Sequence, residues 1–196
     1  MSTRQPLCSR PDCLLHAERE LFVENVWREI GLPDSVDRLA FHKNESAALQ
    51  KILPLLTVEQ LCDVLAVLRA KSGRAFMSPY ASHIVQALLL ALAAKSKAQS
   101  DAQASSRATE AIVQLCEALK GQLVEIIFHA CGTHPFRALV SVLAGIDASE
   151  TPKDGGPPPA DDGGGDADVN KEFFTCLRDF VTELTDPETE GLDHLP

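Results

Sequence analysis

Residues 79–92 read PYASHIVQALLLAL, and their apolar side chains recur at the three- and four-residue spacing of an α-helix. On a helical projection of about 100° per residue, Ser82, His83 and Gln86 share one face. The opposite face carries Ile84, Val85, Leu88, Leu89 and Leu92. A polar face of this kind is typical both of a solvated helix and of a helix that presents side chains to a ligand. A single copy does not distinguish between these two interpretations.

The same pattern occurs twice more in the chain. Residues 43–56, KNESAALQKILPLL, match it at an offset of 36 positions upstream, and residues 131–145, CGTHPFRALVSVLAG, match it at an offset of 51 positions downstream. The corresponding polar residues are Ser46 and Gln50 in the upstream copy, and Thr133, His134 and Arg137 in the downstream copy. Recurrence at a regular spacing indicates repeats, and it favours presentation of the polar face over simple solvation.

Each of these helices follows another apolar helix that repeats with it. Residues 61–68 and 112–119 match at the same offset of 51, residues 23–30 take this place in the first unit, and residues 173–180 open a fourth. Paired helices that bury their apolar faces on their neighbours are typical of an α-solenoid. We therefore predict an all-α superhelix of about three and a half repeats, whose polar faces line one concave wall.

Composition divides the rest of the chain. The stretch GGPPPADDGGGDADV, residues 155–169, buries too little apolar surface to offset the entropy of ordering. The stretch KSKAQSDAQASSRA is small and polar throughout, and it accounts for the longer spacing of the third unit. The predicted divisions are a flexible N-terminus (1–17), repeats (18–149) with a polar insertion (95–108), an acidic disordered loop (150–170), the first helix of an incomplete repeat (171–186) and a disordered tail (187–196).

Charge and cysteine content narrow the classes of function. The formal net charge is -10, which argues against a general phosphate-binding surface, although about half of the excess lies in the acidic loop. Four of the six cysteines lie in or beside apolar helical runs, where free cysteine packs as a small hydrophobe. We see no signal peptide and no apolar run near the ~20 residues of a membrane helix. We expect a soluble intracellular protein in a reducing compartment, without membrane contact.

The helix YASHIVQALL resembles the second helix of a Pumilio repeat, in which two residues four apart read a base edge and a third stacks on a base. The order of motifs across residues 18–146 is most similar to the nucleolar Nop-nine branch of this family. The resemblance implies edge contacts by Ser82 and Gln86, and stacking by His83. It assigns the other edge and stacking positions to Ser46 and Gln50, and to Thr133, Arg137 and His134. Ala47 holds the stacking place of the first unit and offers no π surface.

The resemblance further implies a nucleolar factor that binds pre-rRNA of the pre-40S particle during small ribosomal subunit biogenesis. Single-stranded RNA exposes the base edges that repeat proteins read with a few side chains per helix. We expect a monomer without cofactor, metal or catalytic activity. Family members carry more repeats and basic RNA tracks, so we expect a fragment, a truncated isoform or a divergent copy, with little RNA affinity as one alternative.

Other interpretations remain open on the residues alone. Cys8, Cys13 and His16, or His129, Cys131 and His134, resemble zinc ligands but lack the paired spacing of a structural zinc module. Cys131 with His134 suggests a thiol nucleophile and base, yet no third orienting group is placed. A scaffold for a basic partner, such as a ribosomal protein, is the main rival to RNA binding. Lys43, Arg74 and Arg137 near the polar faces favour RNA, whereas acidic residues there would favour a basic peptide.

Overall fold

The structure, a computed structural model, describes residues 11–98, 102–145 and 167–185, which form helices and short connections with no strand among them. Each unit has a long helix, then a short helix, and then a further helix that we call the third helix. The first unit has α1 (Pro11–Ile30), α2 (Pro33–Phe41) and α3 (Lys43–Ile52), with a 3-10 turn η1 (Leu53–Leu55) after it. The second and third units have α4 (Val58–Arg69), α5 (Ser72–Met77) and α6 (Ala81–Ala98), then α7 (Ala102–Leu119), α8 (Leu123–Phe128) and α9 (Thr133–Leu143), and α10 (Ala167–Thr185) follows.

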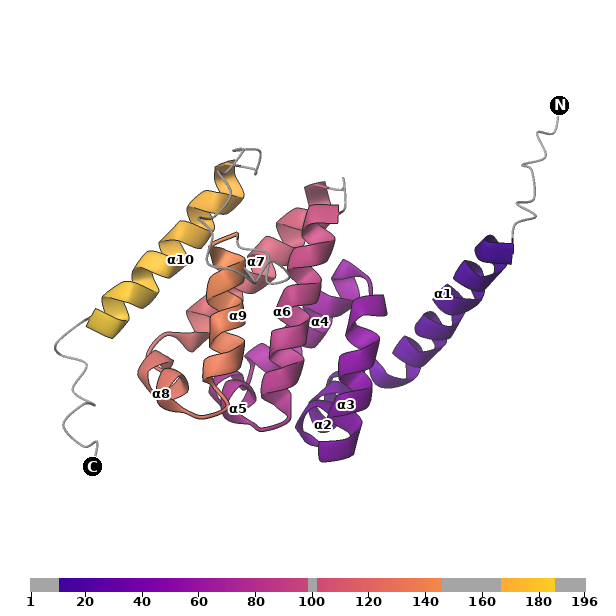
Figure 1. Ribbon diagram of the computed structural model, residues 1–196, viewed down its shortest axis with the longest axis horizontal. Coiled ribbons are helices and arrows are strands. Elements are labelled where there is room, and N and C mark those ends of the chain that lie inside the picture. The colour runs from indigo at the N-terminus through magenta and orange to yellow at the C-terminus, as the bar shows by residue number, and fades with distance from the viewer. Residues whose placement is uncertain (1–10, 99–101, 146–166, 186–196) are drawn as a thin grey trace, which may run out of the picture.

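The repeat units stack side by side, which confirms the predicted all-α solenoid. The third helices form one layer, in which α6 packs between α3 and α9, and the long helices form another, in which α7 packs between α4 and α10 (Figure 1). One continuous core runs through both layers. The apolar positions predicted for the long helices α4 and α7 are all buried: Leu61, Val64, Leu65, Leu68, Ile112, Leu115, Cys116 and Leu119.

The short helices α5 and α8 were not predicted, because the sequence pattern indicated two helices per unit. Each has only six residues, too few to show a helical period. They nevertheless obey the repeat, since α5 begins at Ser72 and α8 begins 51 positions later at Leu123. A repeat unit therefore contains three helices.

Local signals set several helix ends. Thr57 caps α4 in a capping box, in which its hydroxyl accepts from the Gln60 amide at 3.3 Å and the Gln60 side chain accepts from the Thr57 amide at 2.9 Å. Gly121 and Gly145 follow the ends of α7 and α9 with φ of 78° and 71°, a backbone conformation that favours glycine at a helix terminus. These local signals set where α4 begins and where α7 and α9 end.

Polar contacts hold α10 on the preceding unit. The Glu183 carboxylate accepts from the backbone amides of Gly121 at 2.9 Å and Leu123 at 3.3 Å, at the start of α8. Lys120 pairs with Asp179 at 3.0 Å. Phe180 packs against Phe136 of α9 with ring centroids 5.9 Å apart. α10 is thus docked as the long helix of a further unit.

In three places the structure has helix where the sequence predicted a flexible or polar segment. α1 begins at Pro11, inside the predicted flexible segment 1–17, and proline is favoured at a helix start. The polar insertion 95–108 extends helices, since α6 runs to Ala98 and α7 begins at Ala102. α10 begins at Ala167, so residues 167–170 of the predicted acidic loop are helical, whereas most of that loop and the predicted tail 187–196 lie outside the described residues.

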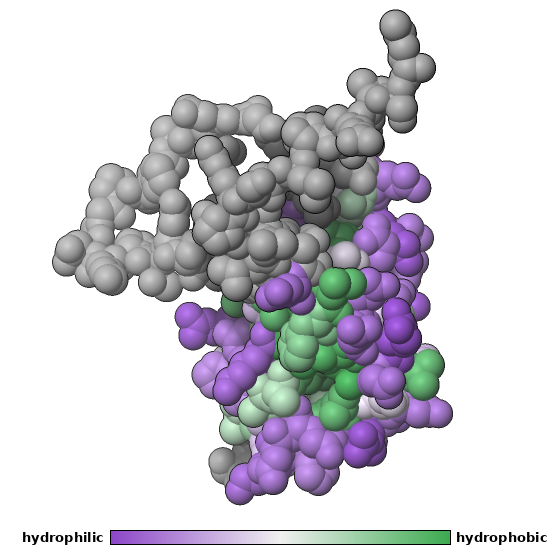
Figure 2. Space-filling view, turned by 90° about the vertical axis from the view of Figure 1, so that its right-hand side faces the viewer, coloured by the Kyte–Doolittle hydropathy of each residue, from purple (hydrophilic) through white to green (hydrophobic). Residues whose placement is uncertain are grey.

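α1 extends away from the stacked helices at one end of the molecule (Figure 1). Only Val23 among its described side chains is buried, at 8% exposed, while Trp27 and Ile30 pack against the core from half-buried positions. The end of the molecule where α1 lies exposes apolar residues along its middle, bordered by hydrophilic ones (Figure 2). The first unit is therefore packed less completely than the second.

We expect Leu88→Ala to destabilise the fold, because Leu88 is fully buried at the centre of α6. Truncating a core leucine costs about 2–5 kcal/mol through lost burial and the cavity left behind. Urea denaturation followed by circular dichroism measures the loss. Leu21→Ala is the matched control, since Leu21 is 59% exposed, and equal stabilities of the two variants would contradict the packing described for α6.

Candidate nucleic-acid interface

The third helices α3, α6 and α9 pack side by side, and the surface they form is here called the three-helix surface. In each, the backbone amide at the first polar position donates to the carbonyl four residues earlier: Ser46 to His42 at 2.9 Å, Ser82 to Ser78 at 3.1 Å and Thr133 to His129 at 3.4 Å. The predicted polar residues therefore occupy equivalent places in the first turns of neighbouring helices. The structure brings the three polar faces together as the repeat pattern predicts.

The first polar position of each helix lies deeper than a helical projection suggests. Ser82 is 3% exposed and Ser46 is 7% exposed, while Thr133 is half-buried. The projection places Ser82 on the polar face, but α3 and α9 pack on both flanks of α6 and narrow its exposed arc. The first polar position is therefore held by a buried or half-buried hydroxyl side chain in all three helices.

Two of these hydroxyls donate to nearby carbonyls. Ser46 Oγ donates to the Lys43 carbonyl at 3.2 Å. Thr133 Oγ1 donates to the carbonyls of Ile127 at 3.1 Å and His129 at 3.3 Å. A hydroxyl that donates keeps lone pairs that accept hydrogen bonds. Each of these side chains thus supports its own helix start and still offers an acceptor.

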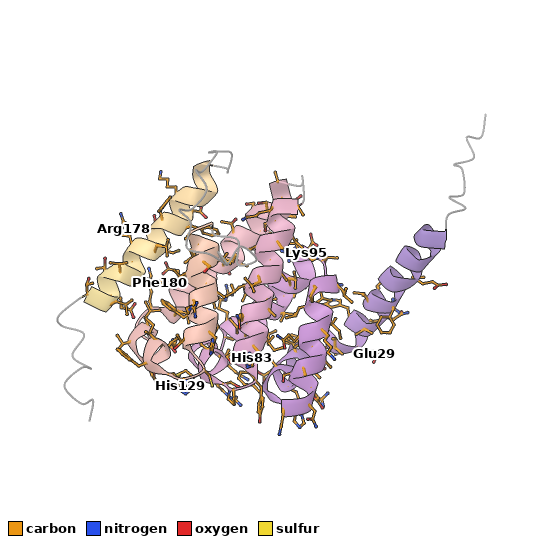
Figure 3. The ribbon with its side chains drawn as sticks, viewed as in Figure 1. Glu29, His83, Lys95, His129, Arg178 and Phe180 are labelled. Atoms are coloured by element: carbon orange, nitrogen blue, oxygen red, sulfur yellow. The ribbon has the colours of Figure 1, made fainter. Side chains whose placement is uncertain are left out.

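The stacking and second edge positions are more open. His83, His134, Gln50 and Arg137 are exposed, and Gln86 is half-buried. His83 lies at the N-terminal end of α6, and His129 lies at the corresponding end of the neighbouring unit (Figure 3). Ala47, at the stacking place of α3, is exposed and has no ring. The surface thus presents two imidazoles and three longer polar side chains above the buried hydroxyls.

The turn before α9 is shaped by its own residues. The His129 ring nitrogen Nδ1 accepts from the Cys131 backbone amide at 3.2 Å. Gly132 has no room for a side chain, because a Cβ there would lie 2.2 Å from the Ile126 carbonyl oxygen. The stretch HACGTH that resembles zinc ligands therefore forms the entry turn of α9. Within the described part of the chain, no group of three His, Cys, Asp or Glu side chains is placed to hold a metal ion.

Three cysteines of the described helices are packing residues. Cys62, Cys116 and Cys176 are buried. Burial raises the pKa of the Cys62 thiol to about 11, and it also raises the pKa of Cys116 and Cys176. A thiol with a raised pKa stays protonated at neutral pH and is a poor nucleophile. Cys131 is half-buried in the turn described above, whereas Cys8 lies outside the described residues.

Charge is segregated between the two layers of the solenoid. The third helices carry five basic residues and one acidic residue, Lys43, Lys51, Lys95, Lys97 and Arg137 against Glu45. The long helices α1, α4, α7 and α10 carry 13 acidic and six basic residues. A groove of about 770 Å³ between α7 and α10 is bordered by three of these acids, Glu110, Glu117 and Glu172. The third helices are thus the basic layer of an acidic protein.

The sequence pattern did not single out Lys51, Lys95 and Lys97 as basic residues of the third helices. Lys95 and Lys97 lie in the last turn of α6, at the opposite end of that helix from His83 (Figure 3). The signal that finds them is the charge of each helix taken separately, since the net charge of the whole chain hides it. Arg74, which was predicted near the polar faces, belongs to the short helix α5 and stacks on Phe41 of the preceding unit, 4.3 Å from the ring centroid. Arg74 therefore lies in a contact between units.

A family model described as the NOP9-like PUF repeat domain matches residues 34–155, more than half of the chain. The chain belongs to the NOP9-like PUF repeat family. The PUF repeats of this match are the units that contain α2 to α9, and α1 and α10 lie outside it. No helix in the described part of this PUF chain is long and apolar enough to cross a membrane.

Solved PUF structures share the fold. The structure of APUM23 with its insert region deleted, with GGAAUUGACGG, is 20% identical to this chain, with a TM-score of 0.63 over 88% of this chain and 29% of that one. The structure of APUM23 with GGAAUUGACGG is 16% identical, with a TM-score of 0.57 over 89% of this chain and 34% of that one. The NOP9-like chain thus spans about a third of the length of these solved chains. No curated protein matches it significantly in sequence.

We expect Thr133→Val to destabilise this NOP9-like PUF chain by about 1 kcal/mol, because the substitution removes the hydroxyl that bonds the turn before α9 while keeping the side-chain shape. Urea denaturation measures the change. Thr175→Val is the matched control, since its exposed hydroxyl bonds only the carbonyl of Lys171 within α10. If both variants keep the stability of the parent chain, the Thr133 hydroxyl does not support the helix start.

Proposed function

We propose that the three-helix surface binds single-stranded RNA, and that the chain acts as a nucleolar factor on pre-rRNA during small ribosomal subunit biogenesis. The observation that carries this proposal is the segregation of charge. A chain of net charge -10 places five basic residues and one acidic residue on the three helices that bear the repeated polar faces. Basic residues attract phosphate, and acidic residues on the long helices repel it.

The side chains on this surface suit the parts of a nucleotide. Exposed imidazoles of His83 and His134 offer flat stacking surfaces, and base stacking contributes about 1–3 kcal/mol per base. Gln50 and Gln86 carry amides that both donate and accept, as a base edge does. The Arg137 guanidinium fits a phosphate or the acceptor edge of a purine.

The mechanism we propose is a non-catalytic clamp. By holding single-stranded pre-rRNA, the chain would control the access of processing enzymes to it. The nucleolar site of action and the pre-rRNA substrate rest on the NOP9-like family match, and RNA as the ligand agrees with the two APUM23 structures, which are described with an RNA sequence. The matched solved chains are about three times longer, so an array of three faces predicts a weak affinity.

The rival proposal, a scaffold for a basic protein, requires acidic residues on the same surface. Glu45 is the only acidic residue of α3, α6 and α9, and one of its carboxylate oxygens is 3.3 Å from Arg38. A basic peptide would therefore meet repulsion on the three-helix surface. RNA is the ligand class that this surface favours.

We expect the combined substitutions His83→Ala and Gln86→Ala to weaken RNA binding by about tenfold or more, because they remove one stacking ring and one edge amide. Fluorescence anisotropy with a mixed single-stranded RNA library and with GGAAUUGACGG measures the affinity, and circular dichroism checks the helix content. Thr175→Ala with Thr182→Ala on α10 provides the control. Unchanged affinity in the His83/Gln86 variant would place the RNA elsewhere.

We expect Arg137→Gln to lower the salt dependence of RNA binding, because each neutralised phosphate releases counterions. The slope of log affinity against log salt should fall by about one unit. Binding titrations at several salt concentrations measure this slope. Arg28→Gln on α1 removes a charge from the acidic layer, and a slope that falls equally in both variants would show that Arg137 makes no particular phosphate contact.

A further inference from the structure

The outermost long helices expose most of the large apolar side chains found on the surface of the described residues. On α10, Phe174 is 68% exposed, Val181 is 59% exposed and Leu184 is 41% exposed. On α1, Leu21 is 59% exposed and Phe22 is 62% exposed. These two helices lie at opposite ends of the molecule, as Glu29 and Arg178 show in Figure 3. Both ends of the solenoid therefore carry an apolar face.

The exposed face of α10 is the face that long helices use to pack on the next unit. In the second unit the equivalent positions all contact α7. Cys62 of α4 lies 3.8 Å from the Arg107 carbonyl, Arg69 of α4 donates to Gln114, and Ser72, the first residue of α5, donates to the Ala118 carbonyl at 3.0 Å. The repeat offsets place Phe174, Val181 and Leu184 at these same three positions of α10. The residues that join units within the molecule are thus replaced on α10 by exposed apolar side chains.

The exposed face of α1 corresponds to the opposite side of such a contact. The residues of α7 that meet α4 in the contacts above are Arg107, Gln114 and Ala118. The repeat offsets place Glu18, Asn25 and Glu29 at these positions of α1, with Phe22 between them. All four of these α1 residues are exposed. This face of α1 therefore occupies the positions through which a long helix contacts the unit before it.

The charges of the two faces are complementary. Lys171 and Arg178 are exposed, and helical spacing places them beside the apolar row of α10. Glu18 and Glu29 lie within the exposed face of α1. A symmetric contact between two α10 helices would place the same two basic residues on both sides of the apolar row. Charge therefore favours the pairing of α10 with α1 over the pairing of α10 with itself.

We propose that copies of this chain associate head to tail, with α10 of one copy packing lengthwise on α1 of the next, as α7 packs on α4. This contact extends the layer of long helices across molecules and leaves the three-helix surface free. It takes the place of the monomer predicted from the sequence. A contact between single helices buries little area, so the association is weak and depends on concentration.

Sedimentation velocity of the full chain without RNA, over a wide range of concentrations, tests the proposal. The parent chain should show an average mass that rises with concentration. Phe22→Asp and Phe174→Asp should each abolish this rise, since each destroys one side of the contact. Both residues are exposed, so circular dichroism should show unchanged helix content. Phe128→Asp is the matched control, because Phe128 is 64% exposed and belongs to α8, not to α1 or α10.

Mixing the two variants identifies the geometry. Phe22→Asp keeps an intact α10 face and Phe174→Asp keeps an intact α1 face, so an equal mixture should form a dimer although neither variant associates alone. A parent chain that stays monomeric at every concentration overturns the proposal. A Phe22→Asp variant that associates as strongly as the parent chain also overturns it, since a symmetric contact through α10 would then be present. RNA plays no part in these measurements, so their outcome is independent of the proposed function.

Discussion

The close packing of α6 among its neighbours is the constraint on which the rest of the molecule depends. Leu88, Leu89 and Leu92 are fully buried, and α6 touches both adjacent third helices as well as the long helix of its own unit. A helix enclosed in this way leaves only a narrow arc open to solvent. On α6 and on its two neighbours α3 and α9, the residue types that stay exposed decide what the surface can bind.

Much of the fold was predictable because helical period and repeat offset are strong signals. The apolar positions of α4 and α7 are buried as predicted, and Phe173, Cys176 and Phe180 of α10 are buried as well. The polar insertion was harder to interpret, because low apolar content indicates a break, whereas alanine-rich sequence such as that from Ala102 to Ala108 has a high helix propensity. The extra residues of the third unit thus lengthen helices instead of forming a loop.

The sequence predicted which positions of α3, α6 and α9 are equivalent, but it did not predict how deeply each of their side chains is buried. Sequence spacing places Ser46, Ser82 and Thr133 at equivalent positions, as the structure does. Spacing says nothing about how closely neighbouring helices approach, and this approach buries Ser82 while His83 stays exposed. Charge shows the same limit. Composition sums over the whole chain, whereas a ligand meets one layer. The basic excess of the third helices becomes visible when each helix is counted by itself, and the structure then shows that these helices pack together.

The docking of α10 has a consequence for how the molecule loses structure. The Glu183 carboxylate joins α10 to two amides at the start of α8, so α10 and the third unit share one set of bonds. α1 has no comparable bond to its neighbours among its described side chains, and it packs mainly through Val23, Trp27 and Ile30. In a linear array each unit is supported only by those beside it. The two ends of the molecule therefore differ in local stability. α1 unfolds first, whereas hydrogen bonds hold α10 to the third unit.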